Sequence, residues 1–422
     1  MPAPTGATIT TAAGLLMEMY PDKVTHDILN TAAPAQARLR RVGRAVEQGR
    51  RMGFSVRTGL PESGADRAEL DISPPPGNVT NQWAYFQFAF RRQPLRVTVE
   101  SMEIGGAIRD ILTSEVEGVM DETAIDLDQN LFLSKRGERA TVTANGASDA
   151  NTIEVSTVQY LRVGMPIDVV LLATGLDGAV GITGARIVTI VPDNPFTGIG
   201  TITIDLDLKA FASLGTTYGI FKAGEWGIKQ YSLEDVIRAT DPTAGAYGGI
   251  ARATTPAWAG TVMALGAVID WRALPSLRDQ IYLNSGKRIT EYWAHQWVVS
   301  DLIELAKWQA RAGMKEKELE MWGNSVTVDG TPVYPMLHVP YGTVYALNMN
   351  TLQVVHPKGK PANGRWIKSG GDSGTMMQYD IEQNVLNAQY FLARELVCLD
   401  PRANGKLTGV TFAPTGSVTP GA

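Results

Sequence analysis

The sequence contains a single cysteine, Cys398, and four histidines in 422 residues. One thiol cannot form an intrachain disulfide. A secreted protein of this length usually carries several cysteines, so the sequence predicts synthesis in a reducing cytoplasm. One cysteine also cannot build a zinc site, and no two histidines have the spacing of metal ligands. We therefore expect no structural disulfide and no metal site.

Long hydrophobic runs are absent as well. The most apolar stretch, residues 163–191, is interrupted by Asp168, Asp177 and Arg186, so it is a poor candidate for a membrane-spanning segment. A secretion signal needs a basic segment ahead of an apolar core, whereas the first basic residue here is Lys23. The chain is therefore expected to be soluble, with no membrane partner.

Basic residues are not in excess, because 38 Lys and Arg stand against 43 Asp and Glu, a formal net charge of -5. A dedicated nucleic-acid binder needs a clear excess of Lys and Arg for phosphate contacts, so this class is disfavoured. Hydrophobic residues make up 44% of the chain, and 43 glycines and 23 prolines indicate many turns. These numbers favour an ordered, multi-domain protein with much β-structure.

Motifs of catalysis and ligand binding are incomplete. Residues 371–374 (Gly-Asp-Ser-Gly) resemble the nucleophile loop of trypsin-like serine proteases, but no histidine occurs in the Ala-Ala-His-Cys context of those enzymes. A polar loop is favoured. Residues 126–130 (Asp-Leu-Asp-Gln-Asn) open like a calcium loop, but its sixth and twelfth positions hold Leu131 and Gly137 instead of Gly and Glu. We interpret them as the solvated end of a helix, and predict no catalytic and no cofactor-binding residues.

Charge is segregated between residues 38 and 71. Seven arginines and one acid lie between Arg38 and Arg57, and four acids with one arginine lie between Glu62 and Asp71. The arginines could contact nucleic acid or pair with acids on neighbouring subunits. The adjacent acidic stretch and the negative net charge favour the second interpretation.

Residues 38–90 predict a long hairpin-like excursion with a basic stem, an acidic tip and one aromatic strand. The strand, residues 82–90, alternates so that Trp83 and Tyr85 lie on one face and Phe86 and Phe88 on the other. An isolated two-stranded ribbon is marginally stable in water, so we expect another copy of the chain to cover it. The predicted inter-subunit contacts are Arg50, Arg51, Arg57, Glu62, Asp66, Glu69, Trp83, Tyr85, Phe86 and Phe88.

A long helix and a β-rich segment follow. Residues 104–132 place apolar side chains on one stripe and acids, including Asp126, on a solvated face, and Gly137 ends the helix. The stripe consists of Ile104, Ile108, Leu112, Val116, Met120, Leu127 and Leu131. Residues 139–222 are short alternating runs separated by Gly, Asn, Asp and Pro. They predict a small β-barrel or sandwich inserted into a host domain.

The remainder of the chain, from Trp226 onward, predicts an α+β arrangement. Ile289, Trp293 and Trp297 recur at i+4 steps, which predicts a largely buried helix over residues 288–311. Residues 326–334, centred on Asp-Gly, predict a hairpin, and residues 344–355 predict a strand pair. Residues 376–399 fit helix and strand equally well.

The order of these parts resembles the major capsid proteins of tailed bacteriophages, whose fold is shared with herpesvirus capsid floors and encapsulins. The strings that carry the resemblance lie at the end of the long helix (residues 124–134), in the β-rich segment (151–155, 161–165 and 187–191) and at residues 344–352, Val-Tyr-Ala-Leu-Asn-Met-Asn-Thr-Leu. The resemblance covers nearly the whole chain by architecture.

The resemblance implies an α+β capsid fold with six segments. These are an N-terminal arm (1–47), an extended loop (48–102), the spine helix of a peripheral domain (103–137), an inserted β domain (138–223), an axial domain (224–322) and a return to both domains (323–422). It also implies a structural protein rather than an enzyme, which self-assembles into pentamers and hexamers of an icosahedral shell around double-stranded DNA. The implied partners are further copies of the chain, portal and scaffolding proteins and non-specifically packaged DNA, with decoration proteins left open. The implied location is the virion, assembled in the host bacterial cytoplasm.

Two features depart from relatives of this family. Some of them cross-link the shell by Lys–Asn isopeptide bonds, whereas no lysine lies between Lys23 and Lys135 here, so we predict no such bond on the loop. Others lose a long N-terminal scaffolding segment, but no long charged helix precedes the loop, so we predict a separate scaffolding protein or none. The alternatives are an encapsulin-like cellular compartment, whose subunits usually lack the β insertion, and a serine hydrolase using Ser373.

Overall fold

The computed structural model describes residues 34–45, 51–60, 77–98, 108–145, 151–172, 180–193, 198–205, 218–242, 245–311, 326–361, 364–367, 378–380 and 385–411. The chain divides into two compact units. Unit 1 combines residues 1–45, 88–131 and 354–395, and unit 2 combines residues 46–87, 132–353 and 396–422. Each unit is therefore built from segments that are distant in the sequence.

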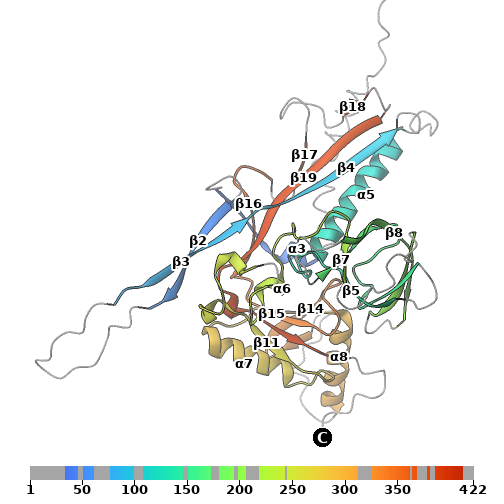
Figure 1. Ribbon diagram of the computed structural model, residues 1–422. Helices are drawn as coiled ribbons and strands as arrows, with labels where there is room; N and C mark the ends of the chain where they lie inside the picture. The colour runs from blue at the N-terminus through green and yellow to red at the C-terminus, as the bar shows by residue number, and fades with distance from the viewer. Residues whose placement is uncertain are drawn as a thin grey trace, which may run out of the picture. The chain divides into compact units, whose positions relative to one another are not determined.

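Unit 1 contains a sheet of six strands with one long helix along it (Figure 1). Its order is β1 (Arg40–Arg44), β16 (Leu352–Pro357), β19 (Val385–Cys398) and β17 (Arg365–Trp366), and β4 (Ala89–Thr98) and β18 (Gln378–Asp380) also pair with β19. Helix α5 (Ile108–Gln129) buries Met120, Ala124 and Leu127 against Tyr390 and Leu392 of β19. The predicted long helix is confirmed, although it ends at Gln129, well before Gly137.

A short helix, α3 (Pro34–Arg38), contacts the C-terminal end of α5. The backbone N–H groups of Ala35 and Gln36 donate to Asp128 Oδ1 over 3.2 and 3.3 Å, and Gln36 Nε2 donates to the Leu127 carbonyl over 2.7 Å. The carboxylate thus satisfies two N–H groups of α3, and the Gln36 amide satisfies a carbonyl in the last turn of α5. These bonds hold residues 34–38 to the end of α5.

The first part of unit 2 is a closed β-barrel with the strand order β10-β5-β6-β9-β8-β7. Its strands are β5 (Ala140–Asn145), β6 (Thr152–Val155), β7 (Pro166–Leu171), β8 (Val180–Pro192), β9 (Gly200–Ile204) and β10 (Tyr218–Lys222). Inward residues alternate with outward ones, and Ile153, Ile167, Ile187 and Ile202 fill the interior. The predicted inserted barrel is present.

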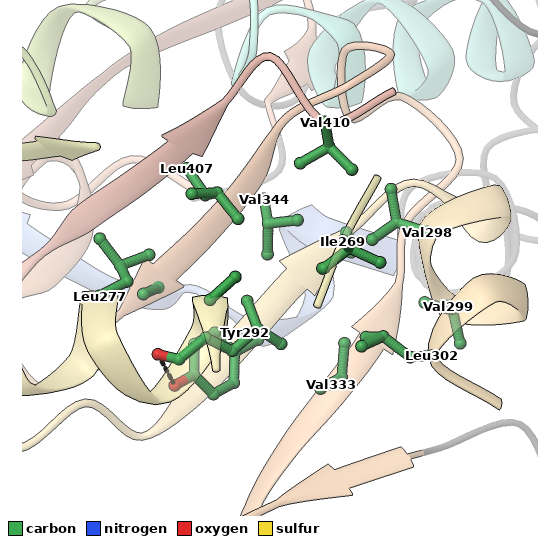
Figure 2. Packing of buried hydrophobic residues seen from close by; sticks show 14 of the residues in the cluster. Ile269, Leu277, Tyr292, Val298, Val299, Leu302, Val333, Val344, Leu407 and Val410 are labelled. Carbon is green, nitrogen blue, oxygen red and sulfur yellow. Dashed lines mark hydrogen bonds between the residues drawn. The ribbon is translucent and has the colours of Figure 1, made fainter. Parts of the chain in front are cut away.

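The second part of unit 2 is a mixed sheet of six strands packed on two helices. The order is β11 (Thr261–Ala264), β20 (Gly405–Thr408), β15 (Val344–Leu347), β12 (Glu291–Ala294), β14 (Thr331–Pro335) and β13 (Val326–Val328). Figure 2 shows Tyr292, Val344 and Leu407 of the sheet packed with Leu277 of α7 (Ala273–Ser285) and Leu302 of α8 (Gln296–Arg311). Among the described residues of the unit there are also four single-turn helices: α6 (Leu233–Val236), η3 (Tyr247–Gly249), η4 (Pro256–Trp258) and η6 (Pro401–Ala403).

The predicted helix over residues 288–311 is wrong in its first part, where strand β12 precedes α8. Tyr292 points into the core of Figure 2, whereas Trp293 lies on the other face of the sheet beside Phe132, with ring centroids 6.4 Å apart. Both side chains are buried. A strand that is covered on both faces carries apolar side chains on both sides, so its sequence shows no alternation of apolar and polar residues. The i+4 spacing of Trp293 and Trp297 therefore suggested one continuous helix, whereas Trp293 lies in a strand and Trp297 in the helix that follows.

Other sequence predictions fare differently. The hairpin is confirmed, because β13 and β14 are joined by Asp329 and Gly330 with φ of 48° and 74°, as a two-residue type I′ turn requires. Residues 344–355 form strands, but β15 and β16 belong to different sheets and do not pair. Within residues 376–399 the structure has strands β18 and β19. No helix in the described part of the chain is long and apolar enough to cross a membrane.

Candidate subunit interface

Within the predicted hairpin loop the structure has a two-stranded ribbon of β2 (Arg51–Gly59) and β3 (Thr80–Gln87), which pairs with no other strand among the described residues (Figure 1). The strands are antiparallel, with Met52 opposite Phe86 and Phe54 opposite Ala84. The ribbon ends at Gln87, because the next strand, β4, pairs with β19 in the sheet of unit 1. The predicted loop over residues 48–102 therefore includes a strand that belongs to a sheet.

One face of the ribbon is anchored in its own unit. Phe86 is 1% exposed and packs edge-on against Tyr231 and Tyr247, with centroid distances of 5.9 and 5.1 Å. Gly248 has φ of 63°, and a Cβ at this position would lie 2.9 Å from Phe86 Cζ and 3.1 Å from Ala84 Cβ. Glycine therefore allows both the left-handed backbone and the close approach of the ribbon to η3.

The opposite face of the ribbon exposes a pair of aromatic rings. Trp83 and Tyr85 are 54% and 51% exposed, and their rings stack with centroids 6.4 Å apart. Their cross-strand partners are Ser55 and Gly53, which are too small to cover them. Trp, Tyr and Arg are the residues most enriched at the energetic centres of protein interfaces. The exposed Arg51 lies on the same face, so we call Arg51, Arg57, Trp83 and Tyr85 the outer ribbon face.

The structure separates the predicted contact residues into three groups. The members of the outer ribbon face are exposed and available to another molecule. Phe86 and Phe88 are 1% and 3% exposed, so their side chains are buried in their own chain and cannot reach a neighbour directly. The remaining predicted contacts lie outside the described residues: Arg50, Glu62, Asp66 and Glu69.

A second exposed surface, on the sheet of unit 1, was missed. Cross-strand pairing puts Arg91 with Leu392 on the face that packs on α5, and Arg92 with Phe391 on the other face. On that other face Phe90 is 45% exposed and stacks on Phe391, with centroids 5.8 Å apart. Arg92, Arg96 and Arg365 are exposed on this face, whereas Glu395 is buried and Asp380, half-buried, lies at its far end.

We call this surface, made by Phe90, Arg92, Arg96, Arg365 and Phe391, the arginine face. Its signal in the sequence is found at every second residue of β4, where Phe90, Arg92, Pro94 and Arg96 put apolar and basic side chains on one face. Sequence reasoning could not find its partner strand, β19, because that strand lies almost three hundred residues away in the chain.

The residues that resemble a calcium loop are buried instead of solvated, which corrects the sequence interpretation. Asp126 is 2% exposed and forms an ion pair of 2.6 Å with Arg91 Nη2. Asp128 is fully buried and accepts the two N–H groups of α3. Both carboxylates therefore have structural partners, and the described residues contain no group of three His, Cys, Asp or Glu side chains that could hold a metal ion.

The motif around Ser373 lies outside the described residues. The histidine with the clearest perturbation, His295, is buried against the Tyr341 ring at 4.6 Å. Burial lowers its pKa to about 4. A general base for a serine nucleophile works best with a pKa near the operating pH, so His295 is poorly suited to that role.

A small hollow lies between β2 of the ribbon and the segments around η4 and η6. It has a volume of about 180 Å³ and is lined by Thr58, Trp258 and the charged Lys287, Asp400 and Arg402, among others. Asp400 pairs with Lys287 over 2.8 Å and with Arg402 over 3.2 Å. The Asp400 carboxylate therefore forms ion pairs with both cations that line the hollow.

Comparison with solved structures identifies the fold. The capsid asymmetric unit of cyanophage A-1(L) aligns with a TM-score of 0.51 and 11% identity over 93% of this chain and 95% of that chain. The holo-SrpI encapsulin complex of Synechococcus elongatus PCC 7942 aligns with a TM-score of 0.46 and 10% identity over 96% of this chain and 98% of that chain. A structure of Gordonia phage Cozz aligns with a TM-score of 0.41 and 12% identity over 96% of each chain.

The chain has the capsid fold of tailed bacteriophages, and the predicted α+β fold class is confirmed. No protein-family model and no curated protein matches the sequence. At 11% identity the likeness concerns the fold alone.

Proposed function

We propose that the chain is the major capsid protein of a tailed bacteriophage, which self-assembles into pentamers and hexamers of an icosahedral shell around double-stranded DNA. The observation that carries this proposal is the outer ribbon face. The two-stranded ribbon carries a stacked Trp83 and Tyr85, both of which are more than half exposed in the described part of the chain. Such a surface is stable in an assembly, where a neighbouring subunit removes both rings from water.

The charges on the chain support contact between copies. Residues 62–71 carry four acids and one arginine, and they connect the two strands of the ribbon. The arginine face offers Arg92, Arg96 and Arg365 as counter-charges on a neighbouring copy. Exposed ion pairs contribute only about 0–1 kcal/mol each, so these contacts would set the register of neighbours more than the strength of their association.

Closure of the shell would supply the stability that a single contact lacks. Each subunit would make several interfaces of roughly 1,600 Å² or less, and a closed shell engages all of them at once. The partners of this assembly would be further copies of the chain, portal and scaffolding proteins, and packaged DNA held without sequence preference. The proposed location is the virion.

Negative-stain microscopy of the purified protein tests the proposal, with closed shells or rings as the expected result. Charge reversal of Arg50 and Arg51 to Glu should impair or misdirect assembly while circular dichroism shows a folded subunit. Normal particles from that double variant would count against the role of the ribbon. Particles from the native source that contain protein cargo and no DNA would favour the cellular compartment instead.

Covalent cross-linking is a further point of comparison. No lysine lies between Lys23 and Lys135, so the ribbon supplies none for an isopeptide bond, and shells should dissociate in hot detergent to a single subunit band. A ladder of higher bands would contradict this expectation. Labelling of Ser373 by a fluorophosphonate would support the hydrolase alternative.

A further inference from the structure

The barrel of unit 2 has an exposed apolar patch on its outer surface. Four large side chains there are between 42% and 64% exposed, although the barrel interior is filled by its own apolar core. Val188 and Val191 belong to the second half of β8 (Figure 1), Val163 lies just before β7, and Ile199 lies just before β9.

Backbone pairing brings these side chains together in two pairs that follow each other along β8, with the exposed Thr189 between them. The register of β8 with β9 shifts between Ile187 and Thr189, and Val188 lies at this irregularity, exposed on the outer surface. The N–H of Gly164 donates to the Ile187 carbonyl over 2.8 Å, which brings Val163 beside Val188.

At the other end of the patch, Val191 pairs with Thr201. The N–H of Asp193 donates to the Ile199 carbonyl over 3.0 Å, which brings Ile199 beside Val191. The two pairs together form the apolar patch, and exposed apolar side chains gathered within a polar rim mark an interaction surface.

The charges around the patch are opposite at its two ends. Arg162 and Arg186 lie at the Val163 end, where Asp205 accepts the backbone N–H of Arg186 over 2.7 Å. Glu154, which lies across from Thr201, and Asp193 lie at the other end. A surface with an apolar centre, a basic end and an acidic end is complementary to itself after a half-turn.

We propose that this patch binds the same patch of a second copy of the chain through a two-fold contact. In such an isologous contact the basic end of each copy meets the acidic end of the other. Contacts between neighbours within a ring are heterologous, so an isologous contact joins a subunit of one ring to a subunit of another. The inference rests on the proposed function and assigns the barrel to contacts between capsomers.

A charge-swap experiment in the full-length chain tests this contact. Arg186→Glu and Asp193→Arg are made separately and together, and shells and free rings are counted by negative-stain microscopy. Each single variant places like charges across the two-fold and should lower the yield of closed shells tenfold or more, while rings persist. The double variant restores opposite charges and should recover at least half of the wild-type yield. Val191→Lys, at the centre of the patch, should lower the yield as the single variants do.

Rescue in the double variant is specific for contact between copies. Positions 186 and 193 are seven steps apart along the chain, which is roughly 23 Å of extended strand at about 3.3 Å per residue, too far for the two side chains to meet within one barrel. Circular dichroism and the shielding of the Cys398 thiol confirm that each variant is folded. Single variants that close shells at the wild-type yield would overturn the inference, and so would a folded double variant that fails to recover.

The same experiment separates this inference from the proposed function. If wild-type protein forms neither rings nor shells under any assembly condition, the proposed function fails. If wild-type protein forms shells and the barrel variants do so equally well, only the two-fold contact fails, and a protein of different sequence becomes the candidate occupant of the patch.

Discussion

The ring of Phe86 packs edge-on against Tyr247 with centroids 5.1 Å apart, whereas Trp83 on the same strand is 54% exposed. One strand therefore has two roles on its two faces. The inner face anchors the ribbon in unit 2, and the outer face leaves an aromatic pair free for another molecule.

Substitution of these two residues separates stability from assembly. Phe86→Ala removes a fully buried ring and should lower the free energy of unfolding by about 3–5 kcal/mol. Trp83→Ala, on the outer face, should change it by about 0.5 kcal/mol or less but reduce the yield of shells. Urea denaturation of the dissociated subunit and particle counts measure the two effects. A Trp83→Ala protein that assembles normally would remove the outer ribbon face from the interface.

The ribbon shows how far its sequence could be interpreted. Alternation placed Trp83 and Tyr85 on one face and Phe86 on the other, and this division is correct. Alternation alone could not tell which face is covered by the same chain, because Tyr231, Tyr247 and Gly248 are distant in the sequence. Both faces were therefore expected to need a second copy, whereas only one face is open.

The stability of the subunit should depend on pH through Asp235, whose carboxyl group caps α6. Burial raises the pKa of Asp235 to about 6, against hydrogen bonds from Lys135 and Ser232 that lower it. The folded state then binds more protons than the unfolded state between about pH 4 and pH 6, so this group costs stability as the pH rises through that range. The loss should be on the order of 3 kcal/mol.

The Asp235→Asn variant tests this assignment, because an amide does not titrate. In this variant the contribution of position 235 to the fall in unfolding free energy between pH 4 and pH 6 should disappear. Glu117→Gln, at an exposed position of α5, is the control and should leave the pH profile unchanged. An identical profile for Asp235→Asn and the wild type would refute the raised pKa.

His295 should act in the opposite direction. Burial lowers its pKa to about 4, so the folded state keeps the imidazole neutral while the unfolded state binds a proton below about pH 6.5. Stability from this group is complete above pH 6.5 and is lost as the pH falls towards 4. In His295→Gln the unfolding free energy should therefore decline less on acidification, and His356→Gln, at a half-buried position, serves as the comparison. If the unfolding free energy of His295→Gln falls on acidification as steeply as that of the wild type, His295 does not contribute to the loss of stability at low pH.

The opposing effects of Asp235 and His295 could not be inferred from the sequence. Asp235 follows Ser232 in a pattern typical of a capping box, and the structure has both of its hydrogen bonds. The pattern says nothing of burial, which depends on segments such as residues 132–135 that reach α6 only in the folded chain. The aspartates of residues 126–130 were misread for the same reason.

The only cysteine should be unreactive in the folded subunit. Cys398 is fully buried and burial raises the pKa of its thiol to about 12, so almost no thiolate is present at neutral pH. Its backbone N–H donates to the Tyr247 hydroxyl over 2.8 Å, which links it to the ring that anchors the ribbon. Labelling by a thiol reagent should be at least a hundredfold slower than in urea-unfolded protein.

The labelling rate of Cys398 also reports on the contact between Phe86 and Tyr247, which anchors the ribbon. Phe86→Ala should speed Cys398 labelling because it loosens Tyr247, whereas Trp83→Ala should not. Equal labelling rates in both variants would show that loss of the Phe86–Tyr247 contact does not expose Cys398.

Residues 34–38 should be released when Gln36 is changed to Ala. The Gln36 side chain is 2% exposed, accepts a 2.8 Å hydrogen bond from Arg394 Nη1 and donates to the Leu127 carbonyl. Burial, with the nearby charges of Arg41 and Arg91, lowers the pKa of Arg394 to about 9. Loss of the Gln36 amide leaves the buried Arg394 guanidinium with fewer hydrogen-bond partners, so the variant should lose about 1–3 kcal/mol of stability.

Trypsin should then cleave the Gln36→Ala variant near residues 38–41 several times faster than the wild type. In the control variant Arg92→Gln, on the arginine face, trypsin should cleave there at the wild-type rate. Unchanged cleavage in Gln36→Ala would mean that the Asp128 carboxylate alone holds α3 in place.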